Sequence, residues 1–468
     1  MKKTQVVVLG GGPGGYAAAF MAADLGLETT LVDDGPNPGG VCLFRGCIPS
    51  KALLHAAKVL NEAREAEMFG IHFASPTIDL DKLRGWKTSV VSSLTGGLGQ
   101  LAKQRKVDFV QGRGKLIGPH SLQVGAETIE FEHLILATGS RPIIPGPLAI
   151  ESERVLDSTG ALELKDIPKK LLVVGGGYIG LELGTVYQSL GSEVTVVEML
   201  PTLLPNADRD LVRVLAKRVE AIMKVLLKTR VASLKDTGKA VEVELEDEQG
   251  KRSETFDRVL ISVGRRPNSE NLGLETTRVQ VNARGFVEID NTGRTAEPSI
   301  YAIGDVAGDP MLAHKASHQG RVAAQAIAGQ KVAFEPLAIP AVVFTDPELA
   351  WAGLTEAEAK EQGLGVKIAR YPWAASGRAL TLGRPEGLTK LVLSDDEEER
   401  VLGVGIVGAG AGELLAEGVL AMEMGAVAED LALSIHAHPT LSETVMESAE
   451  VLSGTSTHVY KPARAARS

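Results

Sequence analysis

Two short apolar runs in this chain each lead directly into a glycine-rich turn. Residues 6–9 read VVVL and residues 171–174 read LLVV, and each run has the length of one buried strand. Each is followed by Gly-x-Gly-x-x-Gly, a helical stretch and a second apolar run that ends in an acidic residue. The pattern therefore predicts the same strand–helix–strand unit twice, with the two copies 165 residues apart.

The glycines of both units stand where a dinucleotide-binding turn needs them. They are Gly10, Gly12 and Gly15 in the first unit and Gly175, Gly177 and Gly180 in the second, and the terminal acids are Asp33 and Glu198. Glycine permits the tight turn and lets the backbone approach a pyrophosphate, while the acid accepts hydrogen bonds from a ribose. One such motif could be an ordinary turn. Two copies with the same spacing of 23 residues between first glycine and acid predict two bound dinucleotides.

Glu198 also indicates which nicotinamide nucleotide binds to the second unit. Its carboxylate would repel the 2′-phosphate of NADP, and the Met-Leu-Pro that follows supplies no arginine to receive that phosphate. NAD is therefore favoured over NADP. The alternative is that Glu198 is only a charge at the end of a strand.

The two cysteines, Cys42 and Cys47, lie together in the run GGVCLFRGCIPSK at residues 39–51. Residues five apart on an ideal helix have Cα atoms about 8 to 9 Å apart, beyond the roughly 4.4 to 6.8 Å that a disulfide spans. A helix here must be distorted, and Gly46 and Pro49 suit a distortion near a helix start. Cys47 would then lie at a helix N-terminus, which lowers a thiol pKa and favours thiol–disulfide exchange. The alternative is a pair of small buried apolar residues.

His438 and Glu443 form a candidate acid–base pair near the C-terminal end. Pro439 keeps His438 out of helical geometry, so the imidazole belongs to a loop before the next helical stretch. A carboxylate that orients an imidazole is the usual arrangement for a histidine acid–base. A second interpretation stays open, in which Thr440-x-x-Glu443 caps the helix and His436 or His438 only packs.

Composition excludes several classes of protein. A chain of 468 residues is expected to form two to four domains, and 44% hydrophobic residues with 52 glycines fit a globular α/β protein. The net charge of −10 and the 4% aromatic content favour no binding to nucleic acid. The short basic tail after Lys461 is expected to be a frayed end rather than a binding arm.

The first strand run begins close to the N-terminus, so we expect no signal peptide. No apolar run approaches the roughly 20 residues that cross a bilayer. Two cysteines cannot form a disulfide scaffold, and no further ligands near them suggest a metal site. These features together predict a soluble cytoplasmic protein without a membrane span or a metal.

These motifs and five others resemble the pyridine nucleotide-disulfide oxidoreductases over nearly the whole chain. The others are ATGSRP (137–142), SVGRRPN (262–268), IYAIGDVAGDPMLAHKA (300–316), TDPELAWAGLTE (345–356) and HAHPTLSE (436–443). Within the family, the resemblance is to enzymes that oxidise protein-bound dihydrolipoamide to lipoamide and reduce NAD+ to NADH. It implies an α/β fold with two Rossmann-like domains, one for FAD and one for NAD, and an α+β C-terminal dimerisation domain.

The resemblance also implies roles for individual residues. FAD contacts are expected at Gly10, Gly12, Gly15, Asp33, Lys51, Gly114, Thr138, Asp305 and Ala313, and NAD contacts at Gly175, Gly177, Gly180, Glu182, Glu198, Val231 and Gly264. Glu182 is expected to pair with Lys51 near the flavin, and Tyr178 to lie near the nicotinamide. Cys42 would exchange with substrate, Cys47 would lie next to the flavin, and the partner copy would supply His438 oriented by Glu443.

On this basis we divide the chain into four parts. They are an FAD domain (1–147), an NAD domain (148–272), a central segment that returns to the FAD domain (273–343) and an interface domain (344–468). In the last part, the acidic run 395–399 is expected to be the turn of a hairpin. The implied partners are a second copy, lipoylated proteins as substrate, and the dihydrolipoyl acyltransferase core of 2-oxo acid dehydrogenase complexes or a glycine-cleavage assembly.

Related enzymes fit less well. Glutathione-type reductases carry arginines for NADP where this chain has Glu198, mercuric reductases carry a further C-terminal cysteine pair, and flavin transhydrogenases lack one active-site cysteine. One departure from the family is Phe44, where asparagine is more common. Two alternatives stay open, namely a related disulfide reductase or diaphorase with another thiol substrate, and a non-catalytic flavin-binding or redox-sensing subunit.

Overall fold

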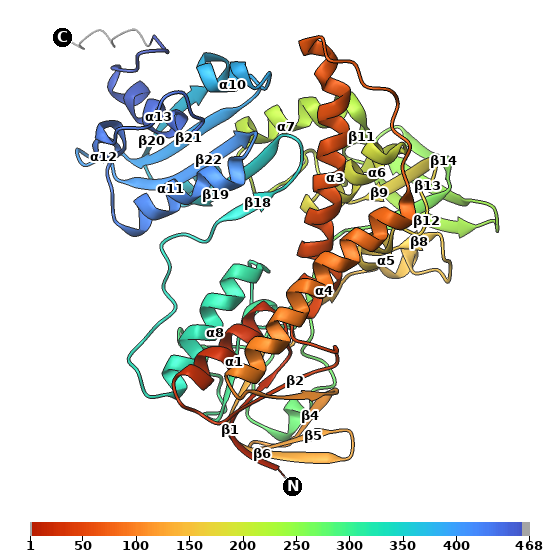
Figure 1. Cartoon of the computed structure of the whole chain (residues 1–468), viewed down its shortest axis with the longest axis vertical. Coiled ribbons are helices and arrows are strands. Elements are labelled where there is room, and N and C mark those ends of the chain that lie inside the picture. The colour runs from red at the N-terminus through yellow and green to blue at the C-terminus, as the bar shows by residue number, and fades with distance from the viewer. Residues whose placement is uncertain (1, 461–468) are drawn as a thin grey trace.

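The structure is a computed structural model that describes residues 2–460. Residue 1 and residues 461–468, which include the basic tail expected to fray, lie outside the described residues. The described chain forms one seven-stranded and two five-stranded sheets, together with a three-stranded and a two-stranded sheet (Figure 1). Each of the three large sheets has helices packed against it, so the described part of the chain has three layered units.

The first glycine unit lies at the centre of the seven-stranded sheet. Its strands are β1 (Lys2–Leu9), β2 (Thr29–Asp33), β3 (Asp108–Gln111), β4 (Gly114–Gly118), β5 (Ser121–Val124), β6 (Glu127–Leu136) and β17 (Ile300–Ala302). They are ordered β3-β2-β1-β6-β5-β4, and β17 pairs with β6. β1 runs parallel to β2 because α1 (Pro13–Asp24) carries the chain back between them. β17 also runs parallel to β6, so this strand of the central segment belongs to the first sheet.

Small residues let two helices cross closely beside this sheet. Helix α1 packs against α8 (Ala313–Ile327), and a Cβ atom on Gly320 would lie 2.5 Å from the carbonyl oxygen of Gly14. No side chain larger than hydrogen fits at such a contact. The packing brings the beginning of α8 next to the first glycine-rich turn.

The second glycine unit forms a five-stranded parallel sheet. Its strands are β8 (Val155–Leu156), β9 (Lys170–Val174), β10 (Glu193–Val197), β11 (Lys224–Leu226) and β15 (Arg258–Ile261), in the order β11-β10-β9-β15-β8. Its helices are α5 (Ser158–Glu163), α6 (Tyr178–Leu190) and α7 (Arg209–Ile222). A three-stranded antiparallel sheet is made of β12 (Arg230–Asp236), β13 (Val241–Asp247) and β14 (Gly250–Phe256). β7 (Ser140–Pro142) pairs with β16 (Arg265–Pro267) and so joins the two units.

The C-terminal unit is an antiparallel five-stranded sheet with helices. Its strands are β18 (Ala341–Val343), β19 (Glu348–Gly353), β20 (Val366–Pro372), β21 (Leu388–Ser394) and β22 (Val401–Gly408), in the order β18-β19-β22-β21-β20. Its helices are α9 (Glu356–Glu361), α10 (Gly377–Thr381), α11 (Ala411–Glu423), α12 (Ala428–Leu433) and α13 (Glu443–Ser453). β21 and β22 form the predicted hairpin around the acidic turn.

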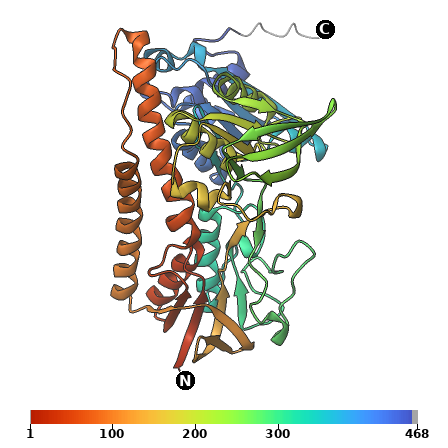
Figure 2. The same cartoon turned by 90° about the vertical axis from the view of Figure 1, so that its right-hand side faces the viewer.

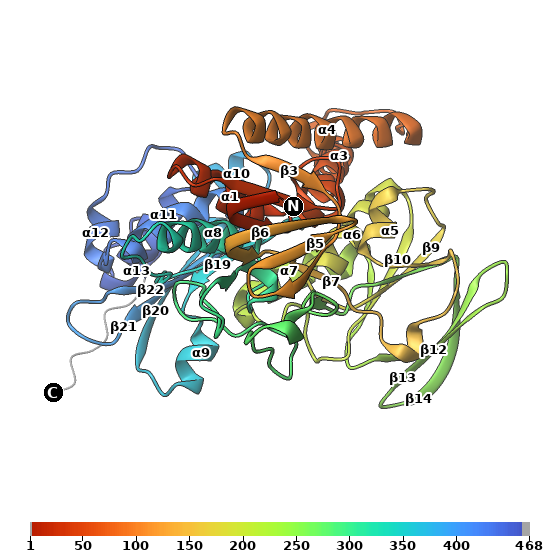
Figure 3. The same cartoon turned by 90° about the horizontal axis from the view of Figure 1, so that it is seen from below.

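Three further helices connect the units. They are the short α2 (Gly40–Arg45), α3 (Cys47–Glu65) and α4 (Leu80–Gln104). α3 and α4 run side by side along one edge of the molecule (Figures 2 and 3), and α3 packs against α6 of the second unit. Every helix within residues 2–460 falls short of the length or apolar character of a membrane span.

The expected fold class is confirmed, since two mostly parallel units are followed by a mixed α+β unit. The domain limits expected at residues 147, 272 and 343 stay predictions.

Candidate active site

The two cysteines lie on either side of a break between helices. α2 ends at Arg45, Gly46 adopts φ −147° and ψ −113°, and α3 begins at Cys47. A Cβ atom on Gly46 would lie 2.9 Å from the carbonyl oxygen of Val41, closer than Cβ atoms normally approach. The expected distortion is therefore present, and it places the Cys47 thiol at the N-terminus of a 19-residue helix.

The structure holds the cysteines as two thiols that differ in acidity. A hydrogen bond from Cys42 and, to a smaller extent, the nearby ammonium of Lys51 together lower the pKa of Cys47 to about 7. The same hydrogen bond and burial raise the pKa of Cys42 well above its usual value. Cys47 is thus the member of the pair that ionises around neutral pH, and Cys42 is the proton donor.

Lys51 lies one helical turn after Cys47 and is held by a buried carboxylate. Its Nζ donates to Oε2 of Glu182 at 2.7 Å, and it also lies 4.5 Å from the centre of the Phe344 ring. Oε1 of Glu182 accepts a hydrogen bond from the backbone N–H of Phe344 at 3.0 Å. The pair expected from the resemblance is therefore formed, and it ties α3 to α6 and to the start of the C-terminal unit.

One cavity of about 870 Å³ connects the first glycine turn to the cysteines. Of the residues expected to contact FAD, it is lined by Gly10, Gly12, Asp33, Lys51, Gly114, Thr138, Asp305 and Ala313, and both cysteines also face it. Gly15 does not line the cavity, because a Cβ atom there would lie 1.7 Å from the carbonyl oxygen of Gly10. Gly15 instead allows helix α1 to pack closely against the first glycine turn. The volume lies within the roughly 300 to 1,000 Å³ typical of ligand pockets.

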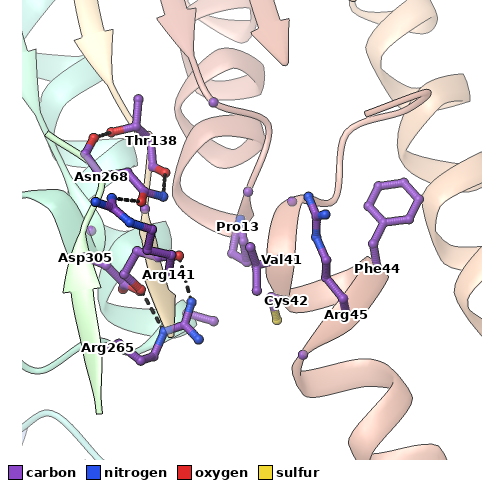
Figure 4. Close-up of a pocket in the computed structure, with 18 of the residues that line it drawn as sticks. Pro13, Val41, Cys42, Phe44, Arg45, Thr138, Arg141, Arg265, Asn268 and Asp305 are labelled. Carbon is purple, nitrogen blue, oxygen red and sulfur yellow. Dashed lines mark hydrogen bonds between the residues drawn. The ribbon is translucent and has the colours of Figure 1, made fainter. Parts of the chain in front are cut away.

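A polar group lies across the cavity from Cys42 (Figure 4). Ser140 donates its hydroxyl to Oδ2 of Asp305 at 2.5 Å, and Arg265 donates from Nε to the same hydroxyl at 2.8 Å. Asn268 and Thr138 exchange two further hydrogen bonds. None of Ser140, Arg265 and Asn268 is predicted as a site residue from the sequence, although all three stand in the motifs ATGSRP and SVGRRPN, one to four residues from Thr138 or Gly264.

Tyr178 and Glu182 bring the second unit to the same cavity. Both lie on α6, directly after the second glycine turn. Burial raises the pKa of the Tyr178 phenol to about 12, so it stays neutral at physiological pH. These positions fit a site in which the nicotinamide end of a second nucleotide approaches the cavity wall.

Asp33 and Glu198, the acids that end the two strand–helix–strand units, are held in the same way. Asp33 accepts hydrogen bonds from the backbone N–H groups of Gly11 at 2.6 Å and Gly35 at 2.8 Å. Glu198 accepts from the corresponding Gly176 and from Leu200, both at 2.7 Å. Each carboxylate is thus fixed beside its glycine turn by backbone N–H groups of the chain itself.

The middle glycines leave room for a ligand in both units. A Cβ atom on Gly12 or Gly177 would meet no atom within 4 Å, whereas Gly175 and Gly180 would clash with neighbouring backbone. Among the other expected NAD contacts, Val231 lies in β12 and Gly264 adopts φ +132° after β15. Apart from Glu182, the expected NAD contacts do not line the 870 Å³ cavity.

His438 and Glu443 form a hydrogen-bonded pair away from the cavity. Nδ1 of His438 lies 2.9 Å from Oε1 of Glu443, and Oε2 of Glu443 accepts from the backbone N–H of Thr440 at 2.7 Å. Burial raises the pKa of Glu443, but these two hydrogen bonds outweigh it and bring the pKa below its usual value. The His438 side chain is 71% exposed, so its second nitrogen is available to a partner.

The alternative interpretation of this loop is only partly present. α13 begins at Glu443 with Ser442 as the cap, so Thr440 is not the N-cap residue of a capping box. His436 contacts a different carboxylate, that of Glu417 on α11. Of the two histidines, His438 therefore keeps a free ring nitrogen while its other nitrogen contacts Glu443. The catalytic role of His438 and Glu443 stays a prediction.

Comparison with known proteins agrees with this arrangement. Residues 4–320 match the family model described as pyridine nucleotide-disulphide oxidoreductase, and residues 339–449 match its dimerisation domain. Dihydrolipoyl dehydrogenase of Haemophilus influenzae is 50% identical over 97% of this chain and 96% of its own length. The enzyme of that name from Thermus scotoductus is 47% identical over 98% and 99%.

Among solved structures, LpdA from Mycobacterium tuberculosis superposes with a TM-score of 0.88. It is 28% identical to this chain, and the match covers 97% of this chain and all of that one. The expected resemblance is thereby confirmed. The chain belongs to the pyridine nucleotide-disulphide oxidoreductase family, whose cofactors FAD and NAD are the two that the sequence predicts.

Proposed function

We propose that this chain oxidises protein-bound dihydrolipoamide to lipoamide and reduces NAD+ to NADH. The observation that carries the proposal is the cysteine pair at the break before α3, where the Cys47 thiol has a pKa of about 7 and faces the cavity. Relatives at 50% identity over nearly the whole chain bear the name dihydrolipoyl dehydrogenase, which supports dihydrolipoamide as the substrate.

In the proposed first half of the reaction, Cys42 and Cys47 begin as a disulfide. His438 takes a proton from one substrate thiol, and the resulting thiolate attacks Sγ of Cys42. The bond between the cysteines breaks and releases Cys47 as a thiolate. The second substrate thiol then loses its proton and attacks the substrate sulfur of the mixed disulfide, which closes lipoamide and releases Cys42.

The outcome of this half is a reduced cysteine pair. The ammonium of Lys51, which lowers the pKa of Cys47, favours Cys47 as the leaving group in the first exchange, and the hydrogen bond from Cys42 stabilises the Cys47 thiolate once Cys42 has been released. The raised pKa of Cys42 lets that sulfur keep a proton. Glu443 orients the His438 ring and stabilises its cation after proton transfer.

FAD held in this cavity would supply the two-electron redox chemistry that connects the reduced cysteines with NAD+. The residues proposed to hold FAD are those of the first glycine turn, with Asp33 at the adenosine ribose and Asp305 at the ribityl chain. Those proposed for NAD are the second glycine turn, Glu198 at its ribose, Glu182, Val231 and Gly264. Lys51, paired with Glu182, would lie near the flavin.

The active form is proposed to be a homodimer. Residues 339–449 match a dimerisation domain, and His438 belongs to this unit rather than to the cavity that contains its own cysteines. A second copy would bring its His438 to the cysteines, so a monomer would lack the base. We further propose the acyltransferase core of a 2-oxo acid dehydrogenase complex as the larger partner. We propose the cytoplasm as the location, because the cysteine pairs of that reducing compartment are usually transient and catalytic.

The experiment is an anaerobic titration of the purified yellow protein with dihydrolipoamide, followed by NAD+. We expect a long-wavelength absorption band from a thiolate lying against the flavin, and loss of that band as NADH forms. If the flavin spectrum does not change with dihydrolipoamide but changes with another thiol, the family assignment stands and dihydrolipoamide is not the substrate.

A further inference from the structure

The loop between α12 and α13 holds two histidines in opposite situations. His436 has 8% of its side chain exposed and His438 has 71%. Nε2 of His436 lies 2.7 Å from Oε1 of Glu417 on α11, and Nδ1 lies 2.8 Å from the carbonyl oxygen of Ser434. Both ring nitrogens of His436 are therefore engaged, and the imidazole is not available for proton transfer.

Both partners of His436 are hydrogen-bond acceptors. The ring lies between the Glu417 carboxylate and the carbonyl oxygen of Ser434, which fixes its orientation. A hydrogen bond to an ionised carboxylate is roughly twice as strong as one between neutral groups. The contact joins two positions 19 residues apart and fixes the loop to α11.

The neighbouring side chains do little to hold the same loop within one subunit. Ile435 is completely exposed and Leu433 is 73% exposed. The other polar contacts near His438 are local, such as that of Thr440 Oγ1 with the carbonyl oxygen of Ala437 at 2.7 Å. The contact between His436 and Glu417 is therefore what anchors the N-terminal side of the loop to a long helix.

We propose that His436 and Glu417 are a positioning pair that sets the place of the His438 imidazole. The inference rests on the proposed function, because His438 acts as a base only in the reaction with dihydrolipoamide. A proton acceptor displaced by about 1 Å can lose about 100-fold in rate. Loss of the pair should therefore slow the thiol step and leave the nucleotide step alone.

The test compares Glu417→Ala with Glu417→Gln in the FAD-loaded dimer. Glutamine can donate its amide to Nε2 while Nδ1 still donates to Ser434, so it can preserve the geometry with a neutral ring. Glu413→Gln, an exposed change one turn earlier on α11, is the matched control for lost charge. Two rates are measured: lipoamide formation, and oxidation of NADH by a quinone, which needs neither the cysteines nor His438.

We expect Glu417→Ala to slow lipoamide formation about 10- to 100-fold, with quinone reduction unchanged. Glu417→Gln and Glu413→Gln should stay within about threefold of the parent in both rates. The proposal is overturned if Glu417→Ala forms lipoamide at the parental rate, or if it slows both reactions equally.

A second variant guards against a folding defect in Glu417→Ala. His436→Asn keeps a donor near the carbonyl oxygen of Ser434 but cannot reach Glu417, and it should show the same selective loss. Parental rates in this variant would also overturn the proposal. A parent protein that does not turn over dihydrolipoamide would instead refute the proposed function before any variant is compared.

Discussion

Nζ of Lys51 lies 2.7 Å from Oε2 of Glu182, although 131 residues separate them in the chain. The contact joins the cysteine-bearing helix α3 to α6, which follows the second glycine turn. The two charges act in opposite directions on the same thiol: Lys51 lowers the pKa of Cys47 and Glu182 raises it. The pKa of Cys47 therefore depends on how the helices of the two nucleotide units are placed relative to each other, because the Lys51–Glu182 pair joins them.

Alkylation of the reduced protein should report the acidity of Cys47. Thiolate is the reactive form, so the rate of Cys47 modification by iodoacetamide should fall as the pH drops through about 7. Peptide mapping assigns the label, and Cys42 should react far more slowly because its pKa is raised. Cys42→Ser keeps a hydroxyl donor and should preserve the low midpoint, whereas Cys42→Ala should raise it. A midpoint near 9 in the parent would contradict this account.

Removing either charge of the Lys51 pair should shift the same midpoint in opposite directions. Lys51→Met removes a cation near the thiolate and should raise the pKa of Cys47, while Glu182→Gln removes an anion and should lower it. Glu182→Gln keeps an acceptor for the backbone N–H of Phe344 and should cost about 1 to 3 kcal/mol of stability. Alkylation profiles and denaturant unfolding measure both effects. Shifts of the same sign in the two variants would refute the assignment.

Mixed dimers should show whether the base comes from the partner copy. Cys42→Ser and His438→Gln chains are each expected to lose lipoamide formation, the latter by about 100- to 10,000-fold. Co-expressed in equal amounts with different affinity tags, they should recover roughly one quarter of parental activity, because half the dimers are mixed and each holds one intact site. Purified mixed dimers with no activity would place His438 in the same subunit as its cysteines.

Glu198 should set the choice of nicotinamide nucleotide. Glu198→Gln keeps much of the contact with the turn but removes the charge, so kcat/KM for NAD+ should fall about 10- to 100-fold. Turnover with NADP+ should rise, since no carboxylate then repels its 2′-phosphate. Glu193→Gln, an exposed change at the other end of β10, is the control and should leave the preference unchanged. An unaltered ratio of NAD+ to NADP+ use in Glu198→Gln would show that the carboxylate is only a strand-end charge.

Much of the site could be predicted because its signals are local. The three glycines of each turn lie within six positions of the sequence. The acid that accepts hydrogen bonds from the turn stands at the end of the next strand, after one helix. The spacing of Cys42 and Cys47 similarly required a helix break, which the structure places at Gly46. The resemblance added the pair of Lys51 and Glu182, which no local pattern would reveal.

Other parts depended on contacts between distant segments. Ser140, Arg265 and Asp305 meet only because β7 pairs with β16 and because the central segment returns to the first sheet. The sequence made His438 the acid–base candidate but left open whether His436 or His438 only packs. Their different roles were decided by Glu417, a residue of another helix that occupies the first ring and leaves the second exposed.

The sequence by itself determined the repeated nucleotide units, the reactive cysteine pair and the family, because these depend on spacing along a single stretch of chain. Only the tertiary structure decided which polar groups face one cavity and which imidazole keeps a free nitrogen. The physical reason is that hydrogen bonds and charge interactions act over a few ångströms in space. Sequence separation does not reveal such distances until the sheets and helices have packed.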